Sequence, residues 1–281
     1  MESVLSGSDI LVIFDFDSTI VEVDSDPWVA EQLGAATRLE ELLTRLPWND
    51  MMDVLMGELH NQGKSIMDVE EALRCIPLQS EKITAIELAF TLGCELRIVS
   101  DANSFFIRTI LDNYGVADLF TEIHTNPATC EESGRLRIRP FHAKSEPPHG
   151  CPLCPPNMCK GRIISKIQSD VLQNRKIIYV GDGSGDYCPS LKLTKDDFVL
   201  PRAEYPLSQM LSQFSNKVKA NVIPWSNGKQ MKDILITVID SSKMLNAEQT
   251  AENLSDSNCA KTALAQREQP TDVLITNPVY A

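Results

Sequence analysis

The sequence places carboxylates directly behind an apolar segment near its amino terminus. In LVIFDFDSTIVEVDSD, Asp15 and Asp17 follow the apolar run at once, and three further acids come soon after: Glu22, Asp24 and Asp26. Carboxylates this close repel one another, which costs stability at the end of a buried strand unless a cation offsets the charge. The stretch therefore indicates a cation-binding site at a strand end.

Two later apolar segments also end in polar side chains. The segment ELRIVS ends on Ser100, and KIIYVGD ends on Asp182. In open α/β sheets, ligands bind beyond the carboxyl ends of the strands. If these segments are neighbouring strands, Asp15, Asp17 and Asp182 converge on one point. Three oxygen donors of this kind predict a Mg²⁺ site, and Mg²⁺ commonly binds phosphate oxygens as well.

Each of these signals alone has a simpler explanation. A single Asp-x-Asp behind a strand is usually a turn and a helix N-cap, and a lone Gly-Asp-Gly is usually a loop. Lys160, which precedes an amphipathic pattern, would by itself be a solvated surface charge. The combination, with each signal at a strand end or a helix start, favours a functional site.

The elements that must position these residues form a recognisable pattern. The segments ILVIF, ELRIVS, KIIYVGD and DFVL are apolar without alternation, which is typical of parallel strands buried on both faces. Helical patterns such as EKITAIELAFTLG and CKGRIISKIQSDVL lie between them. The sequence predicts an α/β fold, a Rossmann-like parallel sheet core with helices on both faces.

A long, mostly helical segment separates the first two predicted strands and is most simply a helical cap inserted after the first strand. We assign residues 24–90 to this cap, and residues 9–23 and 91–240 to the catalytic core. Trp48 is expected to lie in the core of the cap. From residue 241 to residue 281 the composition turns polar without a sustained period. This tail is predicted to be disordered.

The overall composition excludes some partners. A net charge of −13 at pH 7 argues against nucleic acid or an anionic membrane as the main partner. No stretch approaches the roughly 20 apolar residues of a membrane span, and MESVLSGSDI lacks the features of a secretory signal. The 8 cysteines suit a reducing compartment. We expect a soluble, cytoplasmic protein.

The ordered motifs resemble those of a known superfamily. DFDST, Ser100-Asp101, Lys160 at a helix start and GDGSGD are similar to the four motifs of the haloacid dehalogenase-like phosphatases. IVEVDSDPWV, LPWNDMM, HGCPLCPPNMCKG and VGDGSGDYCPSLKL resemble the eukaryotic phosphoethanolamine/phosphocholine phosphatase family. Its plant members include phosphate-starvation-induced pyrophosphatases and thiamine phosphate phosphatase-like proteins.

This resemblance implies a role for each motif residue. Asp15 would be the nucleophile that forms an aspartyl-phosphate, and Asp17 the general acid and base. Ser100 and Lys160 would hold the phosphoryl oxygens. Asp15, the backbone carbonyl of Asp17 and Asp182 would bind Mg²⁺.

The remaining acids divide into three groups. By resemblance, Asp26 and Asp101 recognise the positive amine of phosphoethanolamine or phosphocholine. An alternative for Asp101 is the N-cap of the helix NSFFIRTILDNYG. Asp186 would support Lys160 or the water shell of the metal. The last two acids have no assigned chemistry and are expected to be solvated: Glu22 and Asp24.

A cysteine-rich segment precedes Lys160. HGCPLCPPNMC offers four metal ligands in close succession, namely His149, Cys151, Cys154 and Cys159, which could bind a structural zinc ion in tetrahedral geometry. The alternatives are a reduced cluster that packs the loop and a redox-sensitive pair. Three other cysteines lie beside apolar residues and are expected to be buried core thiols: Cys75, Cys94 and Cys188.

Together these inferences predict a Mg²⁺-dependent phosphatase for small phosphorylated substrates, with a cap that excludes water. Phosphoethanolamine and phosphocholine are the first candidates, and pyrophosphate and thiamine monophosphate the alternatives within the enzyme class. A regulatory binding module on the same fold is the non-enzyme alternative.

Overall fold

The computed structural model describes residues 8–143, 149–170 and 175–245. The chain divides into two compact units, Met1–Ile239 and Asp240–Ala281. The sheet, the cap and the candidate site all lie in the first unit. In the second, residues 240–245 are helical, which differs from the expected irregular tail, and the rest of that tail lies outside the described residues.

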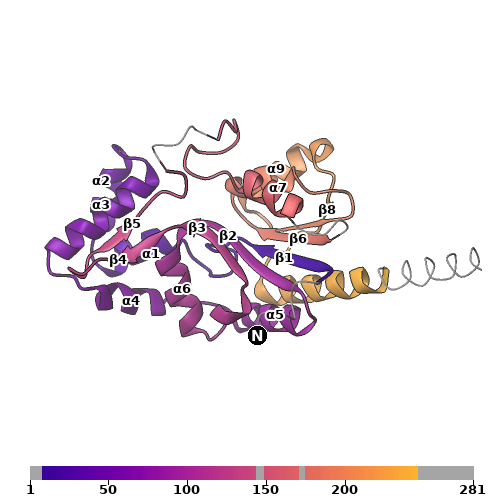
Figure 1. Ribbon diagram of the computed structural model, residues 1–281, viewed down its shortest axis with the longest axis horizontal. Coiled ribbons are helices and arrows are strands. Elements are labelled where there is room, and N and C mark those ends of the chain that lie inside the picture. Colours follow the sequence, from indigo (N-terminus) through magenta and orange to yellow (C-terminus); the bar gives the residue numbers. More distant parts are fainter. Residues whose placement is uncertain (1–7, 144–148, 171–174, 246–281) are drawn as a thin grey trace, which may run out of the picture. The chain divides into compact units, whose positions relative to one another are not determined.

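A parallel sheet forms the centre of the first unit (Figure 1). Its strand order is β3-β2-β1-β6-β7-β8, and every neighbouring pair is parallel. The order places β1 between β2 and β6, so the three predicted motif strands are neighbours. The strands are β1 (Ile10–Phe14), β2 (Glu95–Asn103), β3 (Glu122–Asn126), β6 (Lys176–Gly181), β7 (Phe198–Pro201) and β8 (Asn221–Val222).

Both faces of the sheet are covered, which confirms the predicted α/β fold. In β1, Val12 and Phe14 face one apolar cluster, and Leu11 and Ile13 face the other. The first cluster includes side chains of α5 (Ser80–Thr91), α6 (Ser104–Asn113) and helical residues 228–239. The second includes α7 (Lys160–Asp170), α8 (Tyr187–Ser190) and α9 (Pro206–Gln213). A strand buried on both sides has no polar alternation, which explains the unbroken apolar pattern.

Helices follow β1 directly, as the sequence predicts for a cap. They are α1 (Ser25–Gln32), α2 (Ala36–Leu43), α3 (Trp48–Asn61) and α4 (Ile66–Arg74). A hairpin of β4 (Ala128–Cys130) and β5 (Leu136–Ile138) lies beside α3 (Figure 1). Asp53 joins them, because its Oδ1 accepts a hydrogen bond from the backbone N–H of Ile138 at 3.0 Å.

The predicted cap boundaries at 24 and 90 stay a prediction. At the end of that range, α5 lies against β2. Short 3₁₀ turns complete the unit: η1 (Ala117–Leu119), η2 (Ser184–Asp186) and η3 (Ser215–Lys217). Within the described residues, no helix is both long enough and apolar enough to cross a membrane.

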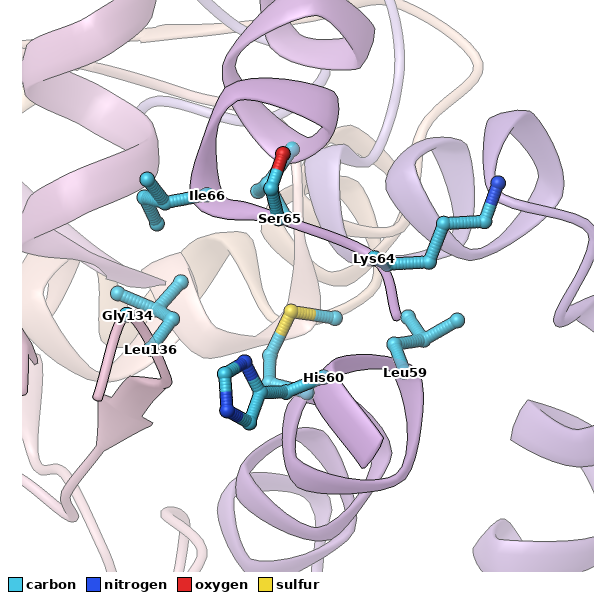
Figure 2. A pocket seen from close by; sticks show the side chains of 9 residues that line it. Leu59, His60, Lys64, Ser65, Ile66, Gly134 and Leu136 are labelled. Carbon is cyan, nitrogen blue, oxygen red and sulfur yellow. The ribbon is translucent and has the colours of Figure 1, made fainter. Parts of the chain in front are cut away.

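One pocket lies inside the cap, between α3, α4 and the β4–β5 turn (Figure 2). His60 and Ser65 line it together with aliphatic side chains that include Leu59, Ile66 and Leu136. Of the described residues that line this pocket, none is an aspartate or a glutamate. The pocket is therefore separate from the place where the sequence predicts chemistry.

Candidate active site

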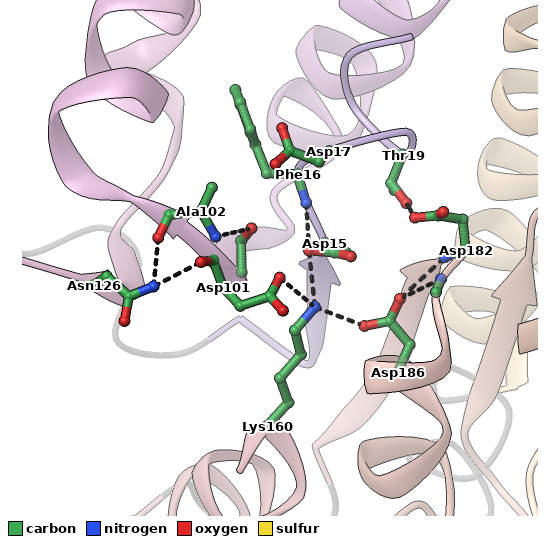
Figure 3. A network of polar contacts seen from close by, with 12 residues as sticks. Asp15, Phe16, Asp17, Thr19, Asp101, Ala102, Asn126, Lys160, Asp182 and Asp186 are labelled. Atoms are coloured by element: carbon green, nitrogen blue, oxygen red, sulfur yellow. Dashed lines mark hydrogen bonds and ion pairs between the residues drawn. The ribbon is translucent and has the colours of Figure 1, made fainter. Parts of the chain in front are cut away.

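Three carboxylates meet where β1 and β6 end (Figure 3). The backbone N–H of Asp15 donates to the carbonyl of Val180 at 2.8 Å, so the parallel pairing of these two strands extends to Asp15. Asp182 follows β6 directly, and Asp186 ends the short turn η2 behind it. Oxygen atoms of Asp15, Asp182 and Asp186 all lie within 4.8 Å of one another. Strand adjacency thus brings together acids that are far apart in sequence.

Lys160, the first residue of α7, reaches into this group (Figure 3). Its Nζ lies 2.9 Å from Asp15 Oδ1, 2.9 Å from Asp186 Oδ1 and 4.0 Å from Asp101 Oδ1. Burial alone would lower the pKa of this lysine, but the surrounding carboxylates outweigh burial and hold the pKa above its usual range. Lys160 is therefore a buried, positively charged group in contact with the proposed nucleophile.

Asp186 organises the loop behind β6. Its Oδ2 accepts backbone N–H bonds from Asp182 and Gly183, both at 3.0 Å, and its Oδ1 accepts the hydroxyl of Tyr179 at 2.6 Å. A Cβ on Gly181 would collide with Oδ2 of Asp186, so only glycine lets the carboxylate approach this closely. The sequence gives no sign of this role for Tyr179, because the residue lies within an apolar strand pattern.

The donor chemistry of the group fits Mg²⁺. Burial and the neighbouring Asp186 raise the pKa of Asp15 well above its usual range, and the same two causes raise the pKa of Asp182 to about 6. Oδ1 of Asp15 accepts a hydrogen bond from the backbone N–H of Phe16, and Oδ1 of Asp182 accepts one from the hydroxyl of Thr19. Each keeps a second oxygen for a hard cation, which would relieve the repulsion between them.

Asp17 is held apart from the three carboxylates by the start of the cap. Its Oδ1 accepts from the backbone N–H of Ser25 and its Oδ2 from the Ser25 hydroxyl, each at 3.1 Å. Burial raises the pKa of Asp17 well above its usual range, and Asp24 and Asp26 raise it further. A raised pKa makes this carboxyl better suited to protonate a leaving group.

A buried ion network holds the loop after Asp17. Glu22 contacts Lys82 Nζ at 2.5 Å and Arg202 Nη2 at 3.0 Å. Arg202 also donates to the carbonyl of Ser18, a residue with a positive φ of 53°. The prediction that Glu22 is solvated is wrong, because its carboxylate is paired with Lys82 and Arg202. These pairs hold in place the loop that follows Asp17. The sequence gives no local sign of partners on α5 and beyond β7.

Ser100 and Asp101 lie at the end of β2. Ser100 is fully buried, and its Oγ accepts from the backbone N–H of Ala102 at 3.2 Å. The side chain of Asp101 is 64% exposed. Asn103 caps α6 through a 3.0 Å bond from the N–H of Phe106. The alternative that Asp101 is the N-cap is therefore wrong, and its carboxylate is available for other contacts.

Asn126, at the end of β3, joins the cap to the core and was missed by the sequence analysis. Its Nδ2 donates to the carbonyl of Asp101 at 2.6 Å (Figure 3). Its Oδ1 accepts from Asn49 Nδ2, Asn157 Nδ2 and the N–H of Phe141, each at 2.9 Å. Asn49 belongs to α3, so the side-chain amide of Asn126 is bonded both to a cap helix and to the end of β2.

Asp26 and Trp48 form a pair where the cap begins. Asp24 is exposed, as expected, and it also caps α1, because its carboxylate accepts from the N–H of Asp26 at 3.3 Å. Asp26 is 4% exposed and accepts from Trp48 Nε1 at 2.5 Å. Burial raises the pKa of Asp26 to about 7. Trp48 is 39% exposed, whereas we expected it in the cap core.

The cysteine-rich segment differs in part from the sequence prediction. Four sulfur atoms gather, from Cys151, Cys154, Cys159 and Cys188. His149 instead has Nε2 2.8 Å from the carbonyl of Pro155, and its Nδ1 accepts from the N–H of Cys151. Cys188 therefore stands in the ligand group where the sequence predicted His149. Cys94 is buried as expected, and Cys75 is exposed.

Asp15 and Asp182 meet at the carboxyl ends of adjacent parallel strands, with Lys160 against them and a helical segment after the first strand. On this fold, that arrangement is the one of the haloacid dehalogenase-like phosphatases, and the protein is a phosphatase of this class. Within the class, the chain belongs to the Putative Phosphatase family, which it matches over residues 10–239.

Known proteins resemble the chain over most of its length. Inorganic pyrophosphatase 2 of Arabidopsis thaliana is 45% identical over 259 residues, which is 90% of this chain and 92% of that protein. A thiamine phosphate phosphatase-like protein of the same plant is 43% identical over 83% of this chain and 96% of its own length. A HAD family hydrolase from Salmonella enterica has the same fold, with a TM-score of 0.55 and 16% identity over 79% of this chain and 69% of that one.

Proposed function

We propose that this phosphatase hydrolyses small phosphate monoesters that carry an organic cation, with Mg²⁺ as the cofactor. Phosphoethanolamine and phosphocholine are the first candidates. The observation that carries the proposal is the pair formed by Asp26 and Trp48, at 2.5 Å, beside the acids of the reaction site.

The reaction would proceed in two steps. A carboxylate oxygen of Asp15 attacks phosphorus, the bond between phosphorus and the ester oxygen breaks, and Asp17 gives its proton to the departing alcohol. Asp17 then takes a proton from water, which attacks the phosphorus and releases phosphate and Asp15. Ser25 would keep Asp17 in place through both steps.

Charge control around the phosphoryl group would come from three sources. Lys160 would neutralise one phosphoryl oxygen while it restrains Asp15, and the hydroxyl of Ser100 would donate to another. Asp15, the backbone carbonyl of Asp17 and Asp182 would hold Mg²⁺. When bound, Mg²⁺ supplies positive charge that lets an anionic carboxylate approach an anionic phosphate.

Substrate choice would follow from the acids that surround this centre. Asp24 and Asp101 both raise the pKa of Asp26, which places all three within electrostatic reach of one another. A cation can rest on the half-exposed indole of Trp48, whose N–H is bonded to Asp26, and next to the exposed Asp101. Cation–π contacts are strongest with Trp. The arrangement suits an ammonium group and opposes a second phosphate.

Pyrophosphate is the second candidate, because a relative that is 45% identical is named an inorganic pyrophosphatase. Thiamine monophosphate carries a thiazolium cation and so belongs to the proposed substrate class. The name of another relative, a thiamine phosphate phosphatase-like protein, favours its inclusion.

The test is kcat/KM with Mg²⁺ for phosphoethanolamine, phosphocholine, thiamine monophosphate, phosphoserine and pyrophosphate, in wild type and Asp26→Asn. We expect Asp26→Asn to raise KM for the cationic esters about tenfold, the effect of roughly 1.4 kcal/mol, and to leave pyrophosphate turnover nearly unchanged. Equal losses on both substrate types would reject cation recognition. Asp15→Asn should abolish turnover of every substrate, and full activity there, or activity without Mg²⁺, would reject the mechanism.

A further inference from the structure

The four sulfur atoms described above come from three different places in the chain. Cys151 and Cys154 lie in the segment before α7, Cys159 immediately precedes Lys160, and Cys188 belongs to α8. All four lie within 4.8 Å of one another. None of them is in a disulfide.

The spacing matches tetrahedral metal coordination. Zinc–sulfur bonds of about 2.3 Å in a tetrahedron place neighbouring sulfur atoms about 3.8 Å apart. Here Cys188 Sγ lies 3.6 Å from Cys151 Sγ and 3.8 Å from Cys159 Sγ. A disulfide would need about 2.05 Å. Four soft thiolate ligands in this geometry favour Zn²⁺ over a hard cation such as Mg²⁺.

The first residues of α7 pack closely against the sulfur atoms. The backbone N–H of Arg162 donates to Cys159 Sγ at 3.4 Å, a contact that would stabilise a thiolate ligand. A Cβ on Gly161 would collide with Cys188 Sγ, so only glycine lets α7 pack directly on the cluster. Residues 149–159 form neither helix nor strand. Their backbone therefore gains little support from regular hydrogen bonding.

We propose that Cys151, Cys154, Cys159 and Cys188 bind one structural zinc ion. With four protein ligands no position is left open for substrate or water, so the ion would hold the fold and take no part in catalysis. Cys159 adjoins Lys160, and Cys188 follows closely on Asp186. The ion would thus fix the start of α7, and with it Lys160, against the loop that carries Asp182 and Asp186.

The first experiment measures metal in full-length protein purified without added metal or chelator. We expect one zinc ion per chain by elemental analysis, released when the thiols are modified. Protein without zinc, whether its four thiols are free or joined in a disulfide by mass spectrometry, would overturn the proposal. This measurement needs no substrate, so its outcome is independent of the proposed function.

Variants then test the ligand set. Cys188→Ser should lose zinc, whereas His149→Ala and the exposed Cys75→Ser should keep it. Zinc loss in His149→Ala, or full zinc in Cys188→Ser, would overturn the set. If Cys188→Ser does not fold, Co²⁺ exchanged into wild type gives a second readout. Thiolate-to-cobalt charge-transfer bands with tetrahedral d–d bands support four sulfur ligands, and their absence overturns the proposal.

The anchoring role is tested by removing zinc from wild type while Mg²⁺ is kept in excess. We expect a lower Tm and a fall in kcat larger than the change in KM, since Lys160 would lose its position against Asp15. Both should recover with stoichiometric zinc and not with more Mg²⁺. Unchanged Tm and kcat after verified zinc removal would overturn the anchoring role.

Discussion

Lys160 Nζ lies 2.9 Å from Oδ1 of Asp15, and both side chains are almost completely buried. The contact joins the first residue of α7 to the residue that follows β1, so these two elements meet at one ion pair. The buried ammonium lowers the pKa of Asp15 and so opposes the increase that burial and Asp186 cause.

Replacing Lys160 by Met should reduce kcat on the order of 10²-fold or more, because one preorganised charge is lost and the pKa of Asp15 rises further. The measurement is steady-state hydrolysis of a generic aryl phosphate with saturating Mg²⁺. Lys166→Met, an exposed lysine of the same helix, is the matched control and should behave as wild type. A Lys160→Met enzyme as active as that control would contradict the role of the ion pair.

Tyr179 supports the same site through Asp186, to which its hydroxyl donates at 2.6 Å. Tyr179→Phe should lower the free energy of unfolding by about 1.5–3 kcal/mol, the range for hydrogen bonds to charged groups. Tyr187 provides a matched control, because among the described residues its buried hydroxyl has no hydrogen-bond partner. Tyr187→Phe should be neutral or stabilising. Urea unfolding of both variants decides, and similar losses in the two would refute the argument.

Stability should depend on pH through Asp26. Burial raises its pKa to about 7 in the folded protein, above about 3.9 when unfolded. The folded state therefore binds this proton more tightly, and the stabilisation that protonation provides is present at low pH and lost as pH rises from about 4 to 7. The full effect is at most about 4 kcal/mol.

Asp26→Asn removes this titration, so the variant should gain stability relative to wild type between pH 5 and pH 8. Urea unfolding at the two pH values, with a chelator present, gives the difference. The exposed Asp112→Asn serves as control and should follow wild type. A difference between Asp26→Asn and wild type that is the same at both pH values would contradict a raised pKa.

The sequence predicted the site where strand geometry alone brings residues together. Asp15 and Asp182 lie behind apolar segments, and adjacent parallel strands deliver their ends to one edge. The placement of these two acids needs only local patterns and one rule of sheet topology. Lys160 was included because the ordered motifs resemble those of a known superfamily, since a lysine before an amphipathic pattern would by itself be a solvated charge.

Side-chain contacts between elements that lie far apart in the sequence could not be predicted, because no sequence motif links the two elements. Asn126 gives no local signal, and its five partners among the described residues come from the cap, β2 and the segment after β5. Cys188 looks like a core thiol beside apolar neighbours until α8 packs against α7. Trp48 was assigned to the cap core on size and hydrophobicity, which cannot show that its N–H is bonded to Asp26.

The network of Glu22, Lys82 and Arg202 should be strongly coupled, because it is buried and contains two cations around one carboxylate. Lys82 Nζ and the Arg202 guanidinium also lie 5.2 Å and 5.4 Å from the centre of the Trp225 ring. Burial lowers the pKa of Lys82 to about 8, although Glu22 counteracts it. Without Glu22, the two cations would face each other in the same buried space.

Glu22→Gln should therefore lower the free energy of unfolding by about 3–5 kcal/mol, the usual range when one partner of a buried ion pair is removed. Glu22→Gln combined with Lys82→Met should lose less than the sum of the two single changes, since the double variant leaves no unpaired lysine. The exposed pair Lys229 and Asp233, at 2.8 Å, is the matched comparison, and Lys229→Met there should cost about 0.5 kcal/mol or less. Urea unfolding of the full cycle measures the coupling, and strictly additive losses at Glu22 and Lys82 would show that the two side chains do not stabilise each other.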